Sequence, residues 1–331
     1  MSGEATTPVV AGAQPATKVP ARWSGLGLVV LATACWSTAG LFITSLVRDG
    51  GFTPLGLAFW RMLVTSLCLF AYLAVRHPRQ LRVRLADVPW FATMGVLAVA
   101  TFQVAWIFAV LINGPSIATI IQCNAPIIVT VIARIIWSES LTWQKWTAIG
   151  LASLGTVLIA WPNDTSGMHL TLAGFLISMA SAVAYAGITL FTKRLARDYS
   201  SWTILAFAFA FAALALLPFQ FGSGVGSVLP QIAGGRVLVT FGGFVLITTI
   251  AGYALYATGL HWLPASVASI AAMSEVPFAA AFGFLFLGDR LSPLQVLGGV
   301  IVVSAVVLLS LRPERAPAEH SAQDVETPAA S

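Results

Sequence analysis

Two stretches of the sequence share one layout and decide the fold: PSIATIIQCNAPIIVTVIARIIWSESL at residues 115–141 and PASVASIAAMSEVPFAAAFGFLFLGDRL at residues 264–291. Each begins with a proline, which the first turn of a helix accepts because no partner is needed there for its missing N–H. Each then runs apolar and carries a second proline in mid-span, Pro126 or Pro277. A proline inside a helix frees a carbonyl, so a polar group nearby has to satisfy it.

The polar residues nearest to these inner prolines differ between the two stretches. Asn124 stands two residues before the inner proline of the first stretch, and Glu275 stands at the same place in the second. Glu275 is the only carboxylate deep within an apolar run of this sequence. It is therefore the first residue at which we expect function.

The composition places the chain in a membrane. Of its 331 residues 58% are hydrophobic and only 9% are charged, with a mean hydropathy of +0.89, whereas soluble domains carry roughly 25% charged residues. The net charge of +5 does not indicate nucleic-acid binding, because the basic residues lie in short loops. The three cysteines and four histidines have no spacing that suits a disulfide or a metal site. We expect no cofactor and no metal.

A membrane-spanning helix needs about 20 mostly apolar residues, and ten such runs are present. The residues before and after them, 1–22 and 312–331, are rich in Ala, Pro, Thr, Glu and Ser, and we expect disordered tails there. The prediction is an all-α polytopic membrane protein with spans at about 23–47, 54–76, 88–111, 115–137, 142–161, 169–192, 200–218, 236–260, 264–287 and 292–311.

Lysine and arginine predict the orientation, since cytoplasmic loops of membrane proteins carry an excess of them. With ten spans, thirteen of the seventeen fall on the side of both termini, three on the opposite side, and Arg61 lies inside the second run. Both termini are therefore predicted to be cytoplasmic, with the chain in a bacterial inner membrane.

The spans repeat with a fixed period. Pro115 and Pro264 are 149 residues apart, and so are Gly25 and Gly174. The period divides the chain into two five-helix repeats, 23–161 and 169–311, joined by a linker at 162–168. An odd number of helices per repeat inverts the second relative to the first, and inverted repeats are typical of transporters that bind substrate near the membrane midplane.

Motifs in this order resemble the drug/metabolite transporter superfamily, in its EamA-like branch of two five-helix repeats. They are ACWS at 34–37, PLGLAFWR at 54–61, EVP at 275–277, LGDRL at 287–291 and GG at 298–299. The resemblance implies ten helices around a central cavity and export of amino acids or other small metabolites, and within the family the chain is most similar to the aromatic amino-acid exporters. Two departures from the family pattern weaken the expectation that both repeats use an ionisable group in the same way. The first repeat has Asn124 where the second has Glu275, and Asp289 stands where the family more often has Glu.

Glu275 has two interpretations. It lies about 11 residues into its run, roughly 16 Å deep at 1.5 Å per residue, near the middle of a ~30 Å core. A charge there costs at least ~2.5 kcal/mol, so the side chain should face a cavity or a partner. In the first interpretation, Glu275 contacts the substrate or takes up a proton during transport. In the second, it is a protonated carboxyl that hydrogen-bonds the backbone carbonyl left without a partner by Pro277. Arg61 either reaches Glu275 or a substrate carboxylate, or it extends to the membrane interface.

The other predicted substrate contacts are polar or aromatic residues well inside the spans. Gln122 shares a helical face with Thr119, Pro126 and Thr130, and it lines the path or bonds a neighbouring helix. Asn124 is included on its repeat relation alone. Buried Trp and Tyr favour a cavity wall because their N–H and O–H groups need partners, although most buried aromatic residues are simply packing. The set is completed by Trp36, Gln103, Trp106, Tyr185 and Tyr253.

Three functions remain open. The first is export by alternating access of small metabolites, above all amino acids with apolar or aromatic side chains. The second is efflux of lipophilic organic cations, with Glu275 as counter-charge and cation–π contacts to the aromatic residues. The third is a membrane enzyme or assembly subunit, which no catalytic motif in the sequence supports. The expected partners are a small-molecule substrate and the lipid bilayer, with protons as a further candidate, no nucleic acid, and a monomeric or homodimeric state.

Overall fold

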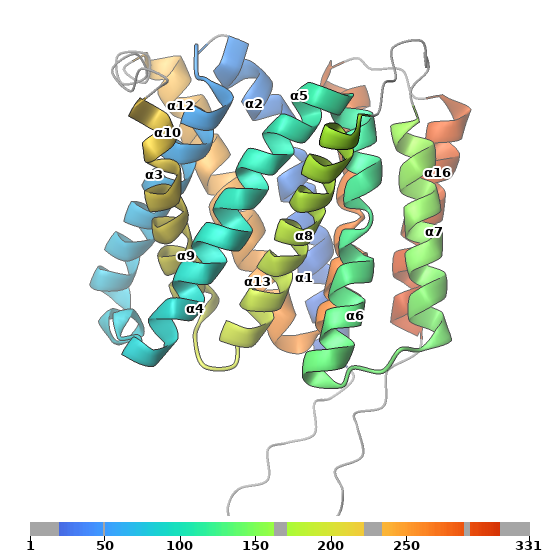
Figure 1. Cartoon of the computed structure of the whole chain (residues 1–331), viewed down its shortest axis with the longest axis horizontal. Coiled ribbons are helices and arrows are strands. Elements are labelled where there is room, and N and C mark those ends of the chain that lie inside the picture. Colours follow the sequence, from blue (N-terminus) through green and yellow to red (C-terminus); the bar gives the residue numbers. More distant parts are fainter. Residues whose placement is uncertain (1–19, 49, 162–170, 222–233, 288–291, 312–331) are drawn as a thin grey trace, which may run out of the picture.

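The computed structural model describes residues 20–48, 50–161, 171–221, 234–287 and 292–311, and the regular structure in these ranges is helical throughout (Figure 1). The predicted tails at 1–19 and 312–331 and the linker at 162–168 lie outside the described residues. Residues 20–22 belong to the first helix and not to the tail, so the helix begins three residues earlier than predicted.

The elements follow one another without strands in the described ranges. In the first half they are α1 Pro20–Ser37, α2 Ala39–Arg48, α3 Pro54–Arg76, η1 Pro78–Leu81, η2 Leu85–Asp87, α4 Val88–Thr93, η3 Met94–Ala100, α5 Thr101–Gln122, α6 Ala125–Trp137 and α7 Trp143–Ala160. In the second half they are α8 Leu172–Leu195, α9 Ser201–Leu216, α10 Pro218–Phe221, α12 Gly235–Gly243, η5 Phe244–Ala251, α13 Gly252–Trp262, α14 Ala265–Ala272, α15 Glu275–Phe282, η6 Gly283–Leu287 and α16 Pro293–Leu311.

Seven helical stretches in the described part are long and apolar enough to cross a membrane. Ser201–Leu216 and Pro293–Leu309 are shorter apolar helices, and α7 packs along the second of them. The count of ten spans and the cytoplasmic placement of the termini stay predictions. The seven are Trp23–Val47, Pro54–Arg76, Leu85–Asn113, Ile117–Trp137, Leu172–Leu195, Gly235–Trp262 and Ala265–Phe286.

The link expected at Asn113 and Gly114 falls between two candidate spans, Leu85–Asn113 and Ile117–Trp137, although α5 is helical from Thr101 to Gln122. The Asn113 amide is used elsewhere: its Nδ2 donates to the carbonyl of Gly174 (2.8 Å) and to the hydroxyl of Ser178 (2.9 Å). Asn113 thus joins α5 to α8 and does not form a local side-chain turn.

Both proline-containing stretches are interrupted helices in the sense that regular helical hydrogen bonding lapses for two residues just before the inner proline, between α5 and α6 and between α14 and α15. The backbone of these residues stays right-handed helical, so each stretch is kinked and continues as one candidate span, Ile117–Trp137 or Ala265–Phe286. Pro126 and Pro277 fall in the first turn after the kink, in α6 and in α15. Discontinuous helices near the midplane usually form the substrate sites of transporters built from repeats.

The repeat is visible in an unusual element. The helix before α5 contains a π segment, η3, and the corresponding helix of the second half contains another, η5. Met94 and Phe244, which begin them, are 150 residues apart. π segments are rare and are found mostly at functional sites; η3 packs against α8 and α9, and η5 packs against α1 and α3.

Helices pair across the two halves: α1 packs along α13, α3 along α9, α5 along α8, and α7 along α16 (Figure 1). A methyl group at Gly155 of α7 would lie 2.6 Å from the carbonyl oxygen of Gly298 in α16, so these glycines permit close packing within the chain. We call the end of the bundle with α2, α10 and α12 the upper face, and the end with α4 the lower face (Figure 1).

Candidate functional site

A partly open cavity of about 360 Å³ lies between the two halves. Seven of the eight predicted contact residues line it: Trp36, Gln103, Trp106, Gln122, Tyr185, Tyr253 and Glu275. The lining includes residues of α2, at the upper face in Figure 1, and none from the last turns of α8 and α13. The cavity therefore extends from the interrupted helices toward the upper face.

Asn124 is the predicted residue that does not line the cavity. It is the residue before α6, and its Nδ2 donates to the carbonyl of Ile121 (2.7 Å), so its amide stays on its own backbone. Asn124 and Glu275 thus share their distance from the inner proline but not their side-chain placement.

Glu275 is the first residue of α15, half-buried, and part of the cavity wall. The backbone at the break is satisfied by other groups: Ser274 Oγ donates to the carbonyl of Ala271 (2.8 Å), and Ser37 Oγ donates to the carbonyl of Glu275 (2.7 Å). In the part of the chain that is described, no hydrogen bond or ion pair engages the Glu275 carboxylate. The interpretation as a structural carboxyl beside Pro277 therefore has no contact to support it.

The first N–H groups of α15 bond to the preceding turn, from Val276 to the carbonyl of Met273 (3.2 Å) and from Phe278 to the carbonyl of Ser274 (3.3 Å). The Glu275 carboxylate therefore keeps a free side toward the cavity.

Arg61 also lines the cavity. Its guanidinium carbon lies 5.0 Å from the centroid of the Phe244 ring, and its Nε is buried without a hydrogen-bond partner. No described carboxylate lies within ion-pair distance of it, Glu275 included. Two opposite charges thus line one cavity without contacting each other.

Aromatic side chains contribute two groups of contacting rings to the wall. The ring of Trp36 lies 5.1 Å from the rings of both Tyr253 and Tyr256, and Phe102 lies 5.3 Å from Tyr185 and 6.3 Å from Trp106. Of these residues, Trp36, Tyr253, Phe102, Tyr185 and Trp106 line the cavity. The indole N–H of Trp36 is buried without a hydrogen-bond partner, beside Gly252.

Gln122 combines both roles that the sequence left open, since it lines the cavity and its Oε1 accepts a hydrogen bond from Ser181 of α8 (3.0 Å). Gln103 is buried and lines the cavity.

Among the lining residues that the sequence-based prediction did not include are Phe102, Phe244 and Thr248. Phe102 lies one helical turn before Trp106 on the same face, so helical spacing would have found it. Phe244 and Thr248 line the cavity from the π segment η5, whose altered register no apolar pattern indicates. Within the described residues, no group of three His, Cys, Asp or Glu is placed to hold a metal ion.

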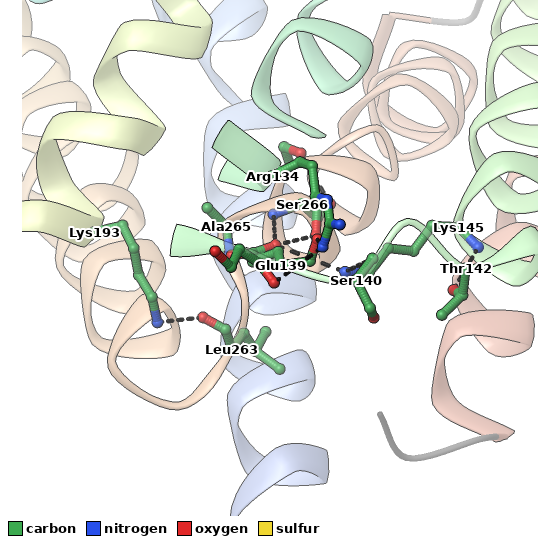
Figure 2. A network of polar contacts seen from close by, with 11 residues as sticks. Arg134, Glu139, Ser140, Thr142, Lys145, Lys193, Leu263, Ala265 and Ser266 are labelled. Carbon is green, nitrogen blue, oxygen red and sulfur yellow. Dashed lines mark hydrogen bonds and ion pairs between the residues drawn. The ribbon is translucent and has the colours of Figure 1, made fainter. Parts of the chain in front are cut away.

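A second polar cluster lies beyond the lower end of α6, at the lower face (Figure 1 and Figure 2). Glu139, after α6, accepts hydrogen bonds from the backbone N–H groups of Ala265 (2.8 Å) and Ser266 (3.3 Å) and from the Ser266 hydroxyl. Lys145 Nζ lies 3.7 Å from the same carboxylate, and both side chains are nearly buried. Glu139 thus ties the first half to the start of α14 in the second.

Lys193 holds the neighbouring helix end in the same region. Its Nζ donates to the carbonyls of Leu260 (2.6 Å) and Leu263 (2.5 Å) at the end of α13 (Figure 2). The connection between α13 and α14 is therefore fixed by a cation on one side and an anion on the other, as the helix dipoles favour.

Comparison with known proteins agrees with this architecture. The model of the EamA-like transporter family matches the chain twice, at residues 23–161 and 172–311. The uncharacterized transporter YwfM of Bacillus subtilis is 27% identical over 289 residues, which cover 87% of this chain and 94% of that protein. A solved crystal structure superposes with a TM-score of 0.69 at 16% identity, covering 87% of this chain and 96% of that one, and so shows the same fold.

Two relatives carry substrate names. A probable terminal-alkyne amino-acid exporter of Streptantibioticus cattleyicolor is 24% identical over 86% of this chain and 92% of its own length. The riboflavin transporter ImpX of Fusobacterium nucleatum is 26% identical over 62% of this chain and 69% of its own length. The two matches of the family model span most of the sequence, and this chain belongs to the EamA-like transporter family of multi-pass membrane transporters.

Proposed function

We propose that this transporter exports small amphipathic metabolites, above all amino acids with apolar or aromatic side chains, by alternating access of the central cavity. The observation that carries the proposal is the unpaired carboxylate of Glu275 at the start of a half-helix, inside a wall of aromatic rings. A carboxylate suits an ammonium group, and aromatic and aliphatic side chains suit an apolar substituent.

The relatives support a small-molecule substrate without naming one for this chain. An amino-acid exporter and a riboflavin transporter are both similar to it, at 24% and 26% identity. The cavity of about 360 Å³ lies at the lower end of the range for small-molecule sites, which favours an amino acid over a larger ligand.

Efflux of lipophilic organic cations is the second candidate, favoured by the same carboxylate and aromatic wall. Arg61 weighs against it. A guanidinium in the cavity repels a ligand that carries positive charge alone.

A competition experiment tests the proposal. In proteoliposomes, efflux of radiolabelled phenylalanine should be inhibited by unlabelled tryptophan and leucine, and little by tetraphenylphosphonium at the same concentration. Strong inhibition by tetraphenylphosphonium, with none by the amino acids, would replace amino-acid export by cation efflux.

We further propose ten spans in a bacterial inner membrane, with the lower face and both termini toward the cytoplasm, on the bias of lysine and arginine. Arg79, after α3, and Arg236, at the start of α12, are both exposed and lie on opposite sides in this scheme. In a background without the three native cysteines, Arg79→Cys should react with an impermeant thiol reagent only from the cytoplasm, and Arg236→Cys only from the periplasm. Labelling of both from one side would contradict the ten-span scheme.

A further inference from the structure

Arg61 is the charged group of the cavity that the proposed function does not yet use. It lies on α3 within a membrane span, where an unpaired guanidinium is costly and is usually matched by a carboxylate, by backbone carbonyls or by a ligand. Its described surroundings offer only the face of Phe244, at 5.0 Å, and the Nε remains without a partner. This site is therefore incomplete without an anion.

Glu275 does not supply that anion. It lines the same cavity, yet no ion pair joins it to Arg61 among the described residues. Had the pair formed, each charge would have neutralised the other and the cavity would suit uncharged ligands. Because both remain open, the cavity presents one cationic and one anionic position, with the rings of Trp36 and Tyr253 also in its wall.

We propose that Arg61 binds the carboxylate of the transported substrate while Glu275 binds its ammonium group, so that Arg61 selects zwitterionic amino acids over amines. The inference rests on the proposed function and adds to it the residue that recognises the substrate carboxylate. The planar guanidinium pairs with a carboxylate through two parallel N–H···O bonds, which a lysine ammonium cannot reproduce. The aromatic rings then hold the apolar side chain.

Three ligands of the same skeleton test the assignment in the full-length transporter. Phenylalanine carries both charges, phenethylamine lacks the carboxylate, and 3-phenylpropionate lacks the amine. With the wild type, phenylalanine should compete for transport about 10- to 150-fold more strongly than either analogue, the range expected for one charge-assisted hydrogen-bonded contact. Equal competition by phenethylamine and phenylalanine would overturn the proposal without any variant.

Substitutions at Arg61 sharpen the test. In Arg61→Gln, phenylalanine should compete for transport about 10- to 150-fold more weakly than in the wild type, whereas phenethylamine should compete equally well or better. The preference for phenylalanine over phenethylamine is then lost. Arg61→Lys keeps the charge but cannot form the two parallel hydrogen bonds, and it should retain part of the preference for phenylalanine over phenethylamine. Arg76→Gln removes the same charge from the exposed end of the same helix and should change nothing, as a matched control.

The outcomes separate this inference from the function on which it rests. If the wild type binds no phenylalanine, the proposed function fails, and the role of Arg61 with it. If the wild type binds phenylalanine but the Arg61 variants weaken competition by phenylalanine and by phenethylamine to the same extent, amino-acid export stands and the Arg61 assignment fails.

Discussion

Replacing Glu275 with glutamine should weaken binding of an amino-acid substrate by about 10- to 150-fold. Glutamine keeps the shape of the side chain and some of its hydrogen bonds but carries no charge, so the substrate ammonium loses its counter-charge. A partly desolvated charged hydrogen bond contributes about 1.5–3 kcal/mol, which corresponds to that range in affinity. The measurement is the concentration dependence of substrate exchange in proteoliposomes.

The same variant distinguishes a counter-charge from a proton carrier. If Glu275 takes up the proton that drives transport, glutamine should abolish accumulation driven by a pH gradient and leave exchange of substrate for substrate intact. If Glu275 is a counter-charge alone, exchange and accumulation should weaken together. Glu319→Gln makes the same chemical change in the C-terminal tail predicted from the sequence and serves as the control. Unchanged substrate affinity in Glu275→Gln would exclude the counter-charge role.

The cavity could be located from the sequence because the physical constraints on a membrane span are strict. A carboxylate in mid-span has to face a cavity or a partner, and Glu275 lines the cavity. Polar and aromatic residues inside the spans obey the same rule, which is why Gln122, Trp36 and Tyr253 were found with it. The periodicity of 149 residues further placed the two proline-containing stretches at corresponding positions.

What the sequence could not show is the local backbone at those prolines. A proline in an apolar run is compatible with a kinked helix or with a complete break, and the choice depends on whether neighbouring hydroxyls satisfy the freed backbone. Here the backbone stays right-handed helical through Met273 and Ser274, and the helix is kinked, with the hydroxyls of Ser37 and Ser274 bonded to carbonyls on either side of the kink. Glu275 consequently stands directly after the kink, as the first residue of α15.

The directions of individual side chains also could not be predicted from the sequence. Arg61 was compatible with the interface or with the cavity, because its long stem reaches either. Its direction is seen in its contact with Phe244, which comes from the π segment of a helix far along the chain. Asn124 shows the opposite case, since its amide bonds to its own backbone despite its repeat relation to Glu275.

Glu139 is the position at which we expect the largest conformational effect. Alternating access requires the lower face to open, and the hydrogen bonds of Glu139 to Ala265 and Ser266 join the two halves there (Figure 2). Pro264, before α14, offers no side-chain cap, so the orphan N–H groups of that helix are satisfied by a residue of the other half. Opening has to break these bonds, and they stabilise the state in which the cavity extends to the upper face.

Glu139→Ala should therefore shift the population toward the state open at the lower face. Loss of three charge-assisted hydrogen bonds, at roughly 1.5–3 kcal/mol each, would change the ratio of the two states by at least about 1,000-fold if opening leaves the bonds unpaired. Ser269→Cys, a nearly isosteric change at a buried residue of the cavity wall, reports the shift. Its thiol should react with an impermeant reagent added from the lower face slowly in the parent and much faster with Glu139→Ala.

Asp198→Ala provides the matched control, because this carboxylate is 40% exposed and pairs with Arg84 (3.2 Å) and Arg194 (3.7 Å) beyond the end of α8. Exposed ion pairs of this kind contribute little, about 0–1 kcal/mol, and their loss should leave the reactivity of the cysteine unchanged. An equal rise in both variants would indicate general loosening of the bundle, and no rise with Glu139→Ala would show that other contacts hold the lower face closed. A rise confined to Glu139→Ala follows only if this carboxylate, by capping a helix of the opposite half, keeps the two halves together at that end.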